Sequence, residues 1–230
     1  MRSNLRVSGF LHFRTDLGEG IRSGVILEHC RERCHSCCCP ASFFTKSLFD
    51  EASDKTLYSP EELIAYLKEE RTLYDSKPLG INLMGSEPLR MPHYCLQIAA
   101  ALKKDNVSLH IHTCALCEAE VFSMLWPYVD LFVLNLFCIT DKRFKPFPDY
   151  PVSDVINNIL YLDNEKIPYR ICVKVLSHTS KNELYRIAAF LKKRSSLKSI
   201  ILDFSASQMD LEAQREIRHL FLEKGIIIFD

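Results

Sequence analysis

The sequence has no long hydrophobic run and no excess of charge of either sign. No stretch approaches about 18 consecutive apolar residues, and residues 1–6 lack the apolar segment of a signal peptide. Lysine plus arginine and aspartate plus glutamate each total 29, and the longest basic run spans only 192–194. We therefore expect no membrane and no nucleic-acid partner, but a cytoplasmic protein that works as a monomer.

The chain also lacks internal repeats, low-complexity tracts and linkers, so a single domain is expected over 1–230. Its 230 residues are 47% hydrophobic and 25% charged, which is enough to bury one core. Amphipathic segments alternate with short apolar runs along it. Ser59 is expected to cap the first helix, which is predicted to begin at Pro60 and to end near Tyr74.

This alternation predicts an α/β fold in which parallel strands are covered by outer helices. The predicted strands are 25–27, 79–84, 107–113, 131–136, 169–176, 199–203 and 226–229. The later predicted helices are 91–104, 118–126, 153–164, 182–193 and 211–224. About six β/α units of this kind form either a partial barrel or a doubly wound sheet.

Chemically distinctive residues follow four of the predicted strands. They lie in a cysteine-rich loop after 25–27, in a turn at Gly85, in the segment 112–114 and in a proline-containing loop at 141–151. Parallel α/β folds place their sites where strands end, because the carboxyl ends of the strands share one edge. We expect these four segments to converge on one face.

The cysteine-rich loop carries the most specific pattern in the chain. Cys30, Cys34 and Cys37 form a C-x3-C-x2-C cluster, and five of the ten cysteines lie between positions 30 and 39. Such crowding in a chain of this size favours metal ligation over disulfides. Three thiolates can hold a 4Fe-4S cluster with one iron left open to a ligand. Nearby arginines, at positions 22, 31 and 33, favour thiolate over thiol.

A structural zinc site is the alternative interpretation of this loop. Zinc needs a fourth protein ligand, and Cys38, Cys39 or His35 could supply it. Cys114 and Cys117, a second CxxC pair after a predicted strand, could also complete it. That pair is otherwise two buried thiols or a redox pair.

The segment 18–22, Gly-Glu-Gly-Ile-Arg, leads into the cysteine cluster and resembles the N-terminal signature of radical S-adenosylmethionine proteins. The similarity is to the glycyl-radical-enzyme activating enzymes, which include pyruvate formate-lyase activase. It implies a partial (β/α)6 TIM-like barrel over 1–230. It also implies that Cys30, Cys34 and Cys37 hold a 4Fe-4S cluster that binds S-adenosylmethionine.

The same resemblance implies an activity. The reduced cluster would cleave S-adenosylmethionine to a 5'-deoxyadenosyl radical, which removes hydrogen from a glycine of a partner glycyl radical enzyme. A flavodoxin or ferredoxin would supply the electron. No catalytic residue beyond the cluster is implied. The protein has to hold the cofactor and shield it from water.

Further matches imply contacts to S-adenosylmethionine. The turn 83–88 resembles a Gly-Gly-Glu-Pro motif, so Gly85, Ser86 and Glu87 are assigned to the methionine moiety, with Ser86 in place of the second glycine. Ser36 is assigned to adenine through its backbone. Arg170 is assigned to a bidentate carboxylate clamp, with a surface ion pair as the alternative.

Four positions depart from the family pattern. His112 and Asn135 stand where activases carry aspartates that bind a monovalent cation, and Phe137 and Ser205 replace a lysine and a histidine. His112 and Asn135 remain assigned to the cofactor. An imidazolium at His112 could supply positive charge directly, and a core histidine is the alternative.

These departures leave two other functions open. One is a radical S-adenosylmethionine enzyme that acts on a small molecule or a peptide. The other is a metal-stapled binding module whose cofactor site has decayed. Iron and sulfide analysis separates the module from either enzyme.

Overall fold

A computed structural model describes residues 4–27, 57–72, 79–85, 87–140, 152–205 and 207–229. This described part of the chain divides into two compact units. The first unit comprises the described residues up to 113 together with 117–132, and the second comprises 114–116 and the described residues from 133 onward.

The strands of the first unit are ordered β3-β1-β2-β4-β5. Their bounds are Leu5–Arg14 for β1, Ile21–Leu27 for β2, Leu57–Tyr58 for β3, Leu79–Gly85 for β4 and Leu109–Thr113 for β5. β1 is antiparallel to β2 and β3, whereas β2, β4 and β5 run parallel. The sequence predicted only the last three residues of β2 and missed β1 and β3. β1 alternates buried and exposed residues over its first four positions, so it lacks the continuous apolar run of the central strands.

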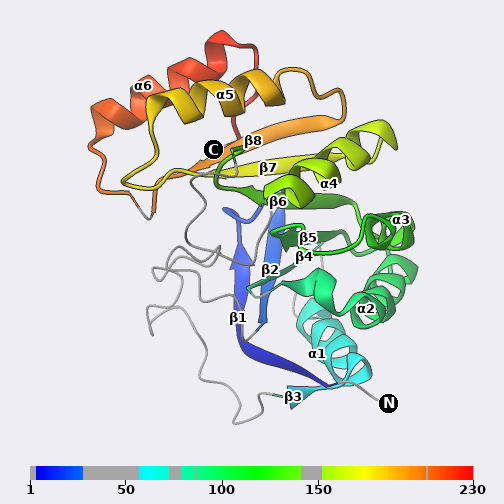
Figure 1. Cartoon of the computed structure of the whole chain (residues 1–230). Coiled ribbons are helices and arrows are strands. Elements are labelled where there is room, and N and C mark those ends of the chain that lie inside the picture. Colours follow the sequence, from blue (N-terminus) through cyan, green and yellow to red (C-terminus); the bar gives the residue numbers. More distant parts are fainter. Residues whose placement is uncertain are drawn as a thin grey trace. The chain divides into compact units, whose positions relative to one another are not determined.

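Helices cover one face of these strands (Figure 1). They are α1 (Pro60–Thr72), α2 (Pro92–Lys104) and α3 (Glu120–Leu125), with 3-10 turns η2 (Pro88–Arg90) and η3 (Trp126–Tyr128). The predicted cap of α1 is confirmed, since Glu62 N donates to Ser59 Oγ at 3.2 Å and Ser59 N donates to Glu62 Oε2 at 2.8 Å. Fully buried side chains from strands and helices form the core, among them Val25, Leu83, Ile111, Leu63 and Ile98.

The second unit contains β6 (Leu131–Leu136, whose first two residues belong to the first unit), β7 (Tyr169–Lys174) and β8 (Leu197–Asp203), in that order. β7 and β8 are parallel. Its helices are α4 (Val152–Asn164), α5 (Lys181–Leu191) and α6 (Leu211–Glu223), and Figure 1 shows α5 beside α6. The strand predicted at 226–229 is a single parallel bridge between Ile200 and Ile228.

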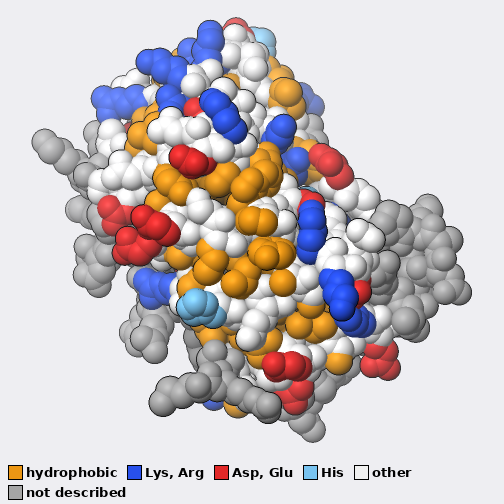
Figure 2. All heavy atoms as spheres, turned by 90° about the vertical axis from the view of Figure 1, so that its right-hand side faces the viewer, with side chains coloured by type: hydrophobic (Ala, Val, Ile, Leu, Met, Phe, Trp, Pro, Cys, Tyr) orange, Lys and Arg blue, Asp and Glu red, His pale blue; other side chains and the backbone are white. Residues whose placement is uncertain are grey.

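The predicted α/β class, with mostly parallel strands and outer helices, is confirmed. Among the described residues, no helix combines the length and the apolar character that crossing a membrane requires. Figure 2 shows acidic and basic side chains mixed over one face, in keeping with the balanced composition. The cysteine-rich loop and the loop 141–151 lie outside the described residues.

Candidate functional site

The structure describes five of the predicted site residues. Gly85, Glu87 and His112 lie in the first unit, and Asn135 and Arg170 lie in the second. The remaining assigned residues, Cys30, Cys34, Ser36, Cys37 and Ser86, lie outside the described residues.

The turn after β4 requires a glycine at position 85. Gly85 has φ +102, in the region that disfavours residues with a Cβ. A Cβ there would lie 2.5 Å from Leu27 O and 2.6 Å from Leu27 N, so the last residue of β4 presses its backbone against the last residue of β2. The requirement for glycine at position 85 therefore has a steric cause within the sheet.

Glu87 ties the end of β4 to the end of β5. Its carboxylate is buried, accepts a hydrogen bond from Leu89 N at 3.2 Å and accepts another from Thr113 Oγ1. The first bond caps η2 and the second fixes the side chain against β5. Two of the four segments expected to converge, the Gly85 turn and 112–114, are thus joined by one carboxylate.

A second set of polar side chains connects the neighbouring strands β2, β4 and β5. Arg22, 2% exposed, donates from Nε to Asn82 Oδ1 and from Nη2 to Ile81 O at 2.9 Å. Asn82 Nδ2 donates to Leu17 O at 2.8 Å and lies 3.0 Å from His112 Nε2. Sequence reasoning missed Asn82. The signal was a polar residue inside the apolar strand 79–84, where a strand buried on both faces has apolar side chains.

In the second unit, Arg170 is held in a fixed position on β7. Its Nε donates to Ser199 Oγ at 2.7 Å, and its guanidinium stacks 3.9 Å from the centroid of the Phe229 ring. Arg170 is 4% exposed, so the alternative of a surface ion pair is wrong. Asn135, on β6, is also buried, and its Nδ2 lies 3.9 Å from Cys114 Sγ.

The ends of β7 and β8 carry a largely buried ion pair that the sequence analysis did not identify. Lys174 Nζ donates to Asp203 Oδ2, and the two side chains are 8% and 16% exposed. Burial acts to raise the pKa of Asp203, but the Lys174 ammonium and the hydrogen bonds from Lys174 and Ser205 outweigh it, so the pKa lies below its usual value. The charged pair is therefore the stable form.

Cys117 has the properties of a buried thiol. Burial, with the negative charges of Glu87 and Glu118, raises the pKa of Cys117 far above its usual value. A thiol in this state is neither a good nucleophile nor a ready metal ligand. Within the described ranges, no group of three or more histidine, cysteine, aspartate or glutamate side chains is arranged to hold a metal ion.

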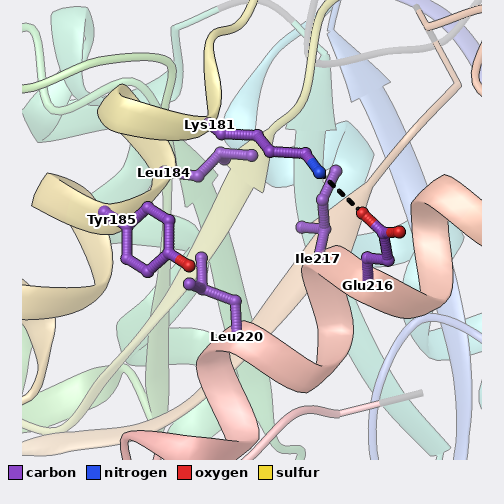
Figure 3. A pocket seen from close by; sticks show the side chains of 6 residues that line it. All are labelled: Lys181, Leu184, Tyr185, Glu216, Ile217 and Leu220. Carbon is purple, nitrogen blue, oxygen red and sulfur yellow. Dashed lines mark hydrogen bonds and ion pairs between the residues drawn. The ribbon is translucent and has the colours of Figure 1, made fainter.

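A shallow hollow lies between α5 and α6 (Figure 3). Its volume is about 100 Å³, below the roughly 300 Å³ at which pockets for cofactor-sized ligands begin. Lys181 Nζ reaches across it to Glu216 Oε2 at 2.7 Å. The hollow is therefore not a candidate cofactor site.

Comparison with known proteins identifies two curated relatives. The chain is 26% identical over 140 residues to the choline trimethylamine-lyase activating enzyme of Oleidesulfovibrio alaskensis, covering 60% of this chain and 45% of the relative. It is 23% identical over 101 residues to the (2S)-3-sulfopropanediol sulfolyase activating enzyme of Bilophila wadsworthia, covering 44% and 33%. The chain thus spans less than half the length of these relatives. No protein-family model matches it.

Solved structures show the same fold. A domain of the pyruvate-formate lyase-activating enzyme from Bacteroides vulgatus matches with TM-score 0.60 at 18% identity, over 65% of this chain and 97% of that domain. Streptococcus suis SuiB bound to S-adenosylmethionine matches with TM-score 0.61 at 14% identity, over 77% and 44%. The chain shares the α/β fold of these two structures, and the predicted resemblance to glycyl-radical-enzyme activating enzymes is confirmed by the named relatives.

Proposed function

We propose that the chain is a radical S-adenosylmethionine activase that installs a radical on a glycine of a partner glycyl radical enzyme. The observation that carries the proposal is the spacing of Cys30, Cys34 and Cys37 shortly after β2. The relatives support it, since two are named as activating enzymes. The single domain over 1–230, the cytoplasmic location and the monomeric state remain part of this proposal.

The donor set fits a three-cysteine 4Fe-4S cluster with S-adenosylmethionine. Three cysteines at this spacing supply thiolates, and the end of β4 offers a glycine backbone next to a buried carboxylate. When bound, the cluster and S-adenosylmethionine would supply the reductive cleavage that generates a radical able to remove hydrogen from glycine. A flavodoxin or ferredoxin would serve as reductant.

The protein's own residues would bind S-adenosylmethionine and orient it. Gly85 leaves its backbone uncovered by a side chain, and Glu87, which Thr113 and Leu89 hold in place, would accept hydrogen bonds from an ammonium group. Arg170, oriented by Ser199 and Phe229, would bind a carboxylate. Ser36 and Ser86 would contribute backbone contacts, and Asn135 a side-chain amide.

Reductive cleavage of S-adenosylmethionine by the anaerobically reconstituted protein tests the proposal. Wild type should contain iron and sulfide near four each and should release 5'-deoxyadenosine. Cys30→Ala, Cys34→Ala and Cys37→Ala should each reduce cleavage to background, whereas Cys38→Ala and Cys39→Ala, matched controls from the same loop, should retain it. Equal cleavage by wild type and the first three variants would refute the mechanism.

The same preparation distinguishes the other functions. If 5'-deoxyadenosine forms but a candidate glycyl radical enzyme gains no glycyl signal in electron paramagnetic resonance, a small-molecule or peptide substrate is favoured. A colourless protein with one zinc would instead indicate the metal-stapled binding module.

A further inference from the structure

We propose that Arg22 and Asn82 are positioning residues that hold His112 as a neutral imidazole with its ring proton on Nδ1. The inference concerns the first unit alone and begins with the side-chain amide of Asn82, which is fully buried between the other two residues. Only its consequence for ligand binding rests on the proposed function.

The orientation of the Asn82 amide is fixed from two sides. Arg22 Nε can only donate a hydrogen bond, so the atom of Asn82 that it contacts must be the oxygen. Leu17 O can only accept, so the atom 2.8 Å from it must be the nitrogen. Reversing the amide would break both contacts at once.

The fixed amide in turn decides the state of His112. Asn82 Nδ2 is a donor, and His112 Nε2 lies 3.0 Å from it, so this ring nitrogen must accept through its lone pair. A proton on Nε2 would place two donors against each other in a partly buried site. The ring is therefore neutral, with Nδ1 as its protonated nitrogen.

Arg22 strengthens this preference through its charge and its fixed position. The guanidinium lies directly over Gly80, where a Cβ would come within 2.3 Å of Nη1, and it also donates to Ser108 O at 3.2 Å. A buried cation one side chain away from the imidazole disfavours a second positive charge there. Gly80 thus creates the space that lets Arg22 reach Asn82.

This state gives His112 a chemical role different from that of an imidazolium. A neutral ring with a proton on Nδ1 offers one hydrogen-bond donor and no net charge. Within the proposed function, His112 Nδ1 would donate a hydrogen bond to an acceptor atom of S-adenosylmethionine. The neutral ring would add no cation to the site.

The tautomer can be measured directly on the full chain. A long-range 15N–1H spectrum of histidine-labelled protein at neutral pH, with the signal assigned through His112→Gln, should show Nδ1 protonated and Nε2 unprotonated. A proton on Nε2, or protons on both nitrogens, would overturn the inference. This measurement on wild type decides the matter even if a variant fails to fold.

Two variants test the role of Asn82. Asn82→Asp replaces the donor with an acceptor, so His112 should gain a proton on Nε2, whereas Asn82→Ala should leave a mixture of tautomers. Asn158→Ala is the matched control, because Asn158 is also buried and its Nδ2 donates to Ala115 O at 2.9 Å in the second unit. An unchanged His112 signal in Asn82→Asp would contradict the proposal.

Ligand binding separates this inference from the proposed function. The affinity of the reconstituted protein for S-adenosylmethionine should fall about tenfold in Asn82→Ala, because the variant loses the hydrogen bond that orients the His112 ring. Undiminished affinity in this variant would overturn the ligand role. If wild type binds no S-adenosylmethionine, the proposed function fails while the tautomer result still stands.

Discussion

Arg22 in the first unit and Lys174 in the second are buried cations that are held in opposite ways. In the first unit, the hydrogen bonds described for Arg22 go to neutral oxygens of Asn82, Ile81 and Ser108. In the second unit, Lys174 is bound directly to the carboxylate of Asp203. Neutral acceptors orient the guanidinium and fix neighbouring amides. The stability of an ion pair instead depends on the charges of both partners. The second arrangement should therefore respond more strongly to a single substitution.

The largest effect is expected from Asp203→Ala, which leaves Lys174 buried without its carboxylate. Removing one partner of a buried pair costs about 3–5 kcal/mol, because the remaining buried charge loses that counter-ion. Urea denaturation measures the loss. The double variant Lys174→Met with Asp203→Leu should recover most of it, since apolar residues often replace buried pairs at little cost. A single variant as stable as wild type would remove the contrast between the units.

The next largest effect is expected from replacing glycines that have different steric surroundings in the two units. Gly85→Ala should lower the free energy of unfolding by about 2–4 kcal/mol, because it combines a positive φ with a collision against Leu27. Gly225 is the matched position in the second unit, with φ +73 and open space within 4 Å of where a Cβ would lie. There Ala should cost about 1 kcal/mol. Equal losses at the two positions would show that the close approach at Gly85 contributes nothing.

The pH dependence of the Lys174–Asp203 pair should change the free energy of unfolding by only a fraction of the loss expected for Asp203→Ala. The pKa of Asp203 is lowered on folding, so its contribution to stability is present above the unfolded value of 3.8 and is lost as pH falls through the folded value. The stability difference between wild type and Asp203→Asn should therefore be constant from about pH 7 to 5 and shrink below about pH 4. A difference that grows on acidification would contradict the assigned direction.

These contrasts also show what the sequence can and cannot reveal. Continuous apolar runs predicted the central parallel strands, and the motif around Gly85 and Glu87 was identified because its residues are adjacent. The sequence did not show which side chains on neighbouring parallel strands contact each other. Arg170 and Ser199, like Lys174 and Asp203, are 29 residues apart, and this separation recurs because both pairs follow one register between β7 and β8. Register depends on the length of the intervening helix and its loops, which periodicity does not determine to the residue.

Asn82 and His112 illustrate the same limit within the site. They are 30 residues apart on β4 and β5, and nothing in the sequence links one to the other. A histidine in a predicted site suggests a switchable charge, because its usual pKa is close to neutral. Only the contact with an amide whose orientation is fixed by Arg22 assigns a tautomer. The state of a titratable side chain thus depends on its neighbours in space.

The smallest effect is expected where a pair with the same charges lies at the surface. Lys181 and Glu216 cross the hollow between α5 and α6 at 2.7 Å, yet their side chains are 77% and 57% exposed (Figure 3). Water solvates both charges whether or not they meet, so Lys181→Ala should leave the urea midpoint unchanged within error. Lys174→Ala is the matched control on the same unit and should lower the midpoint clearly. Because the two pairs join the same kinds of charged group at short range, a similar shift in both variants would mean that burial does not set the strength of the Lys174–Asp203 pair.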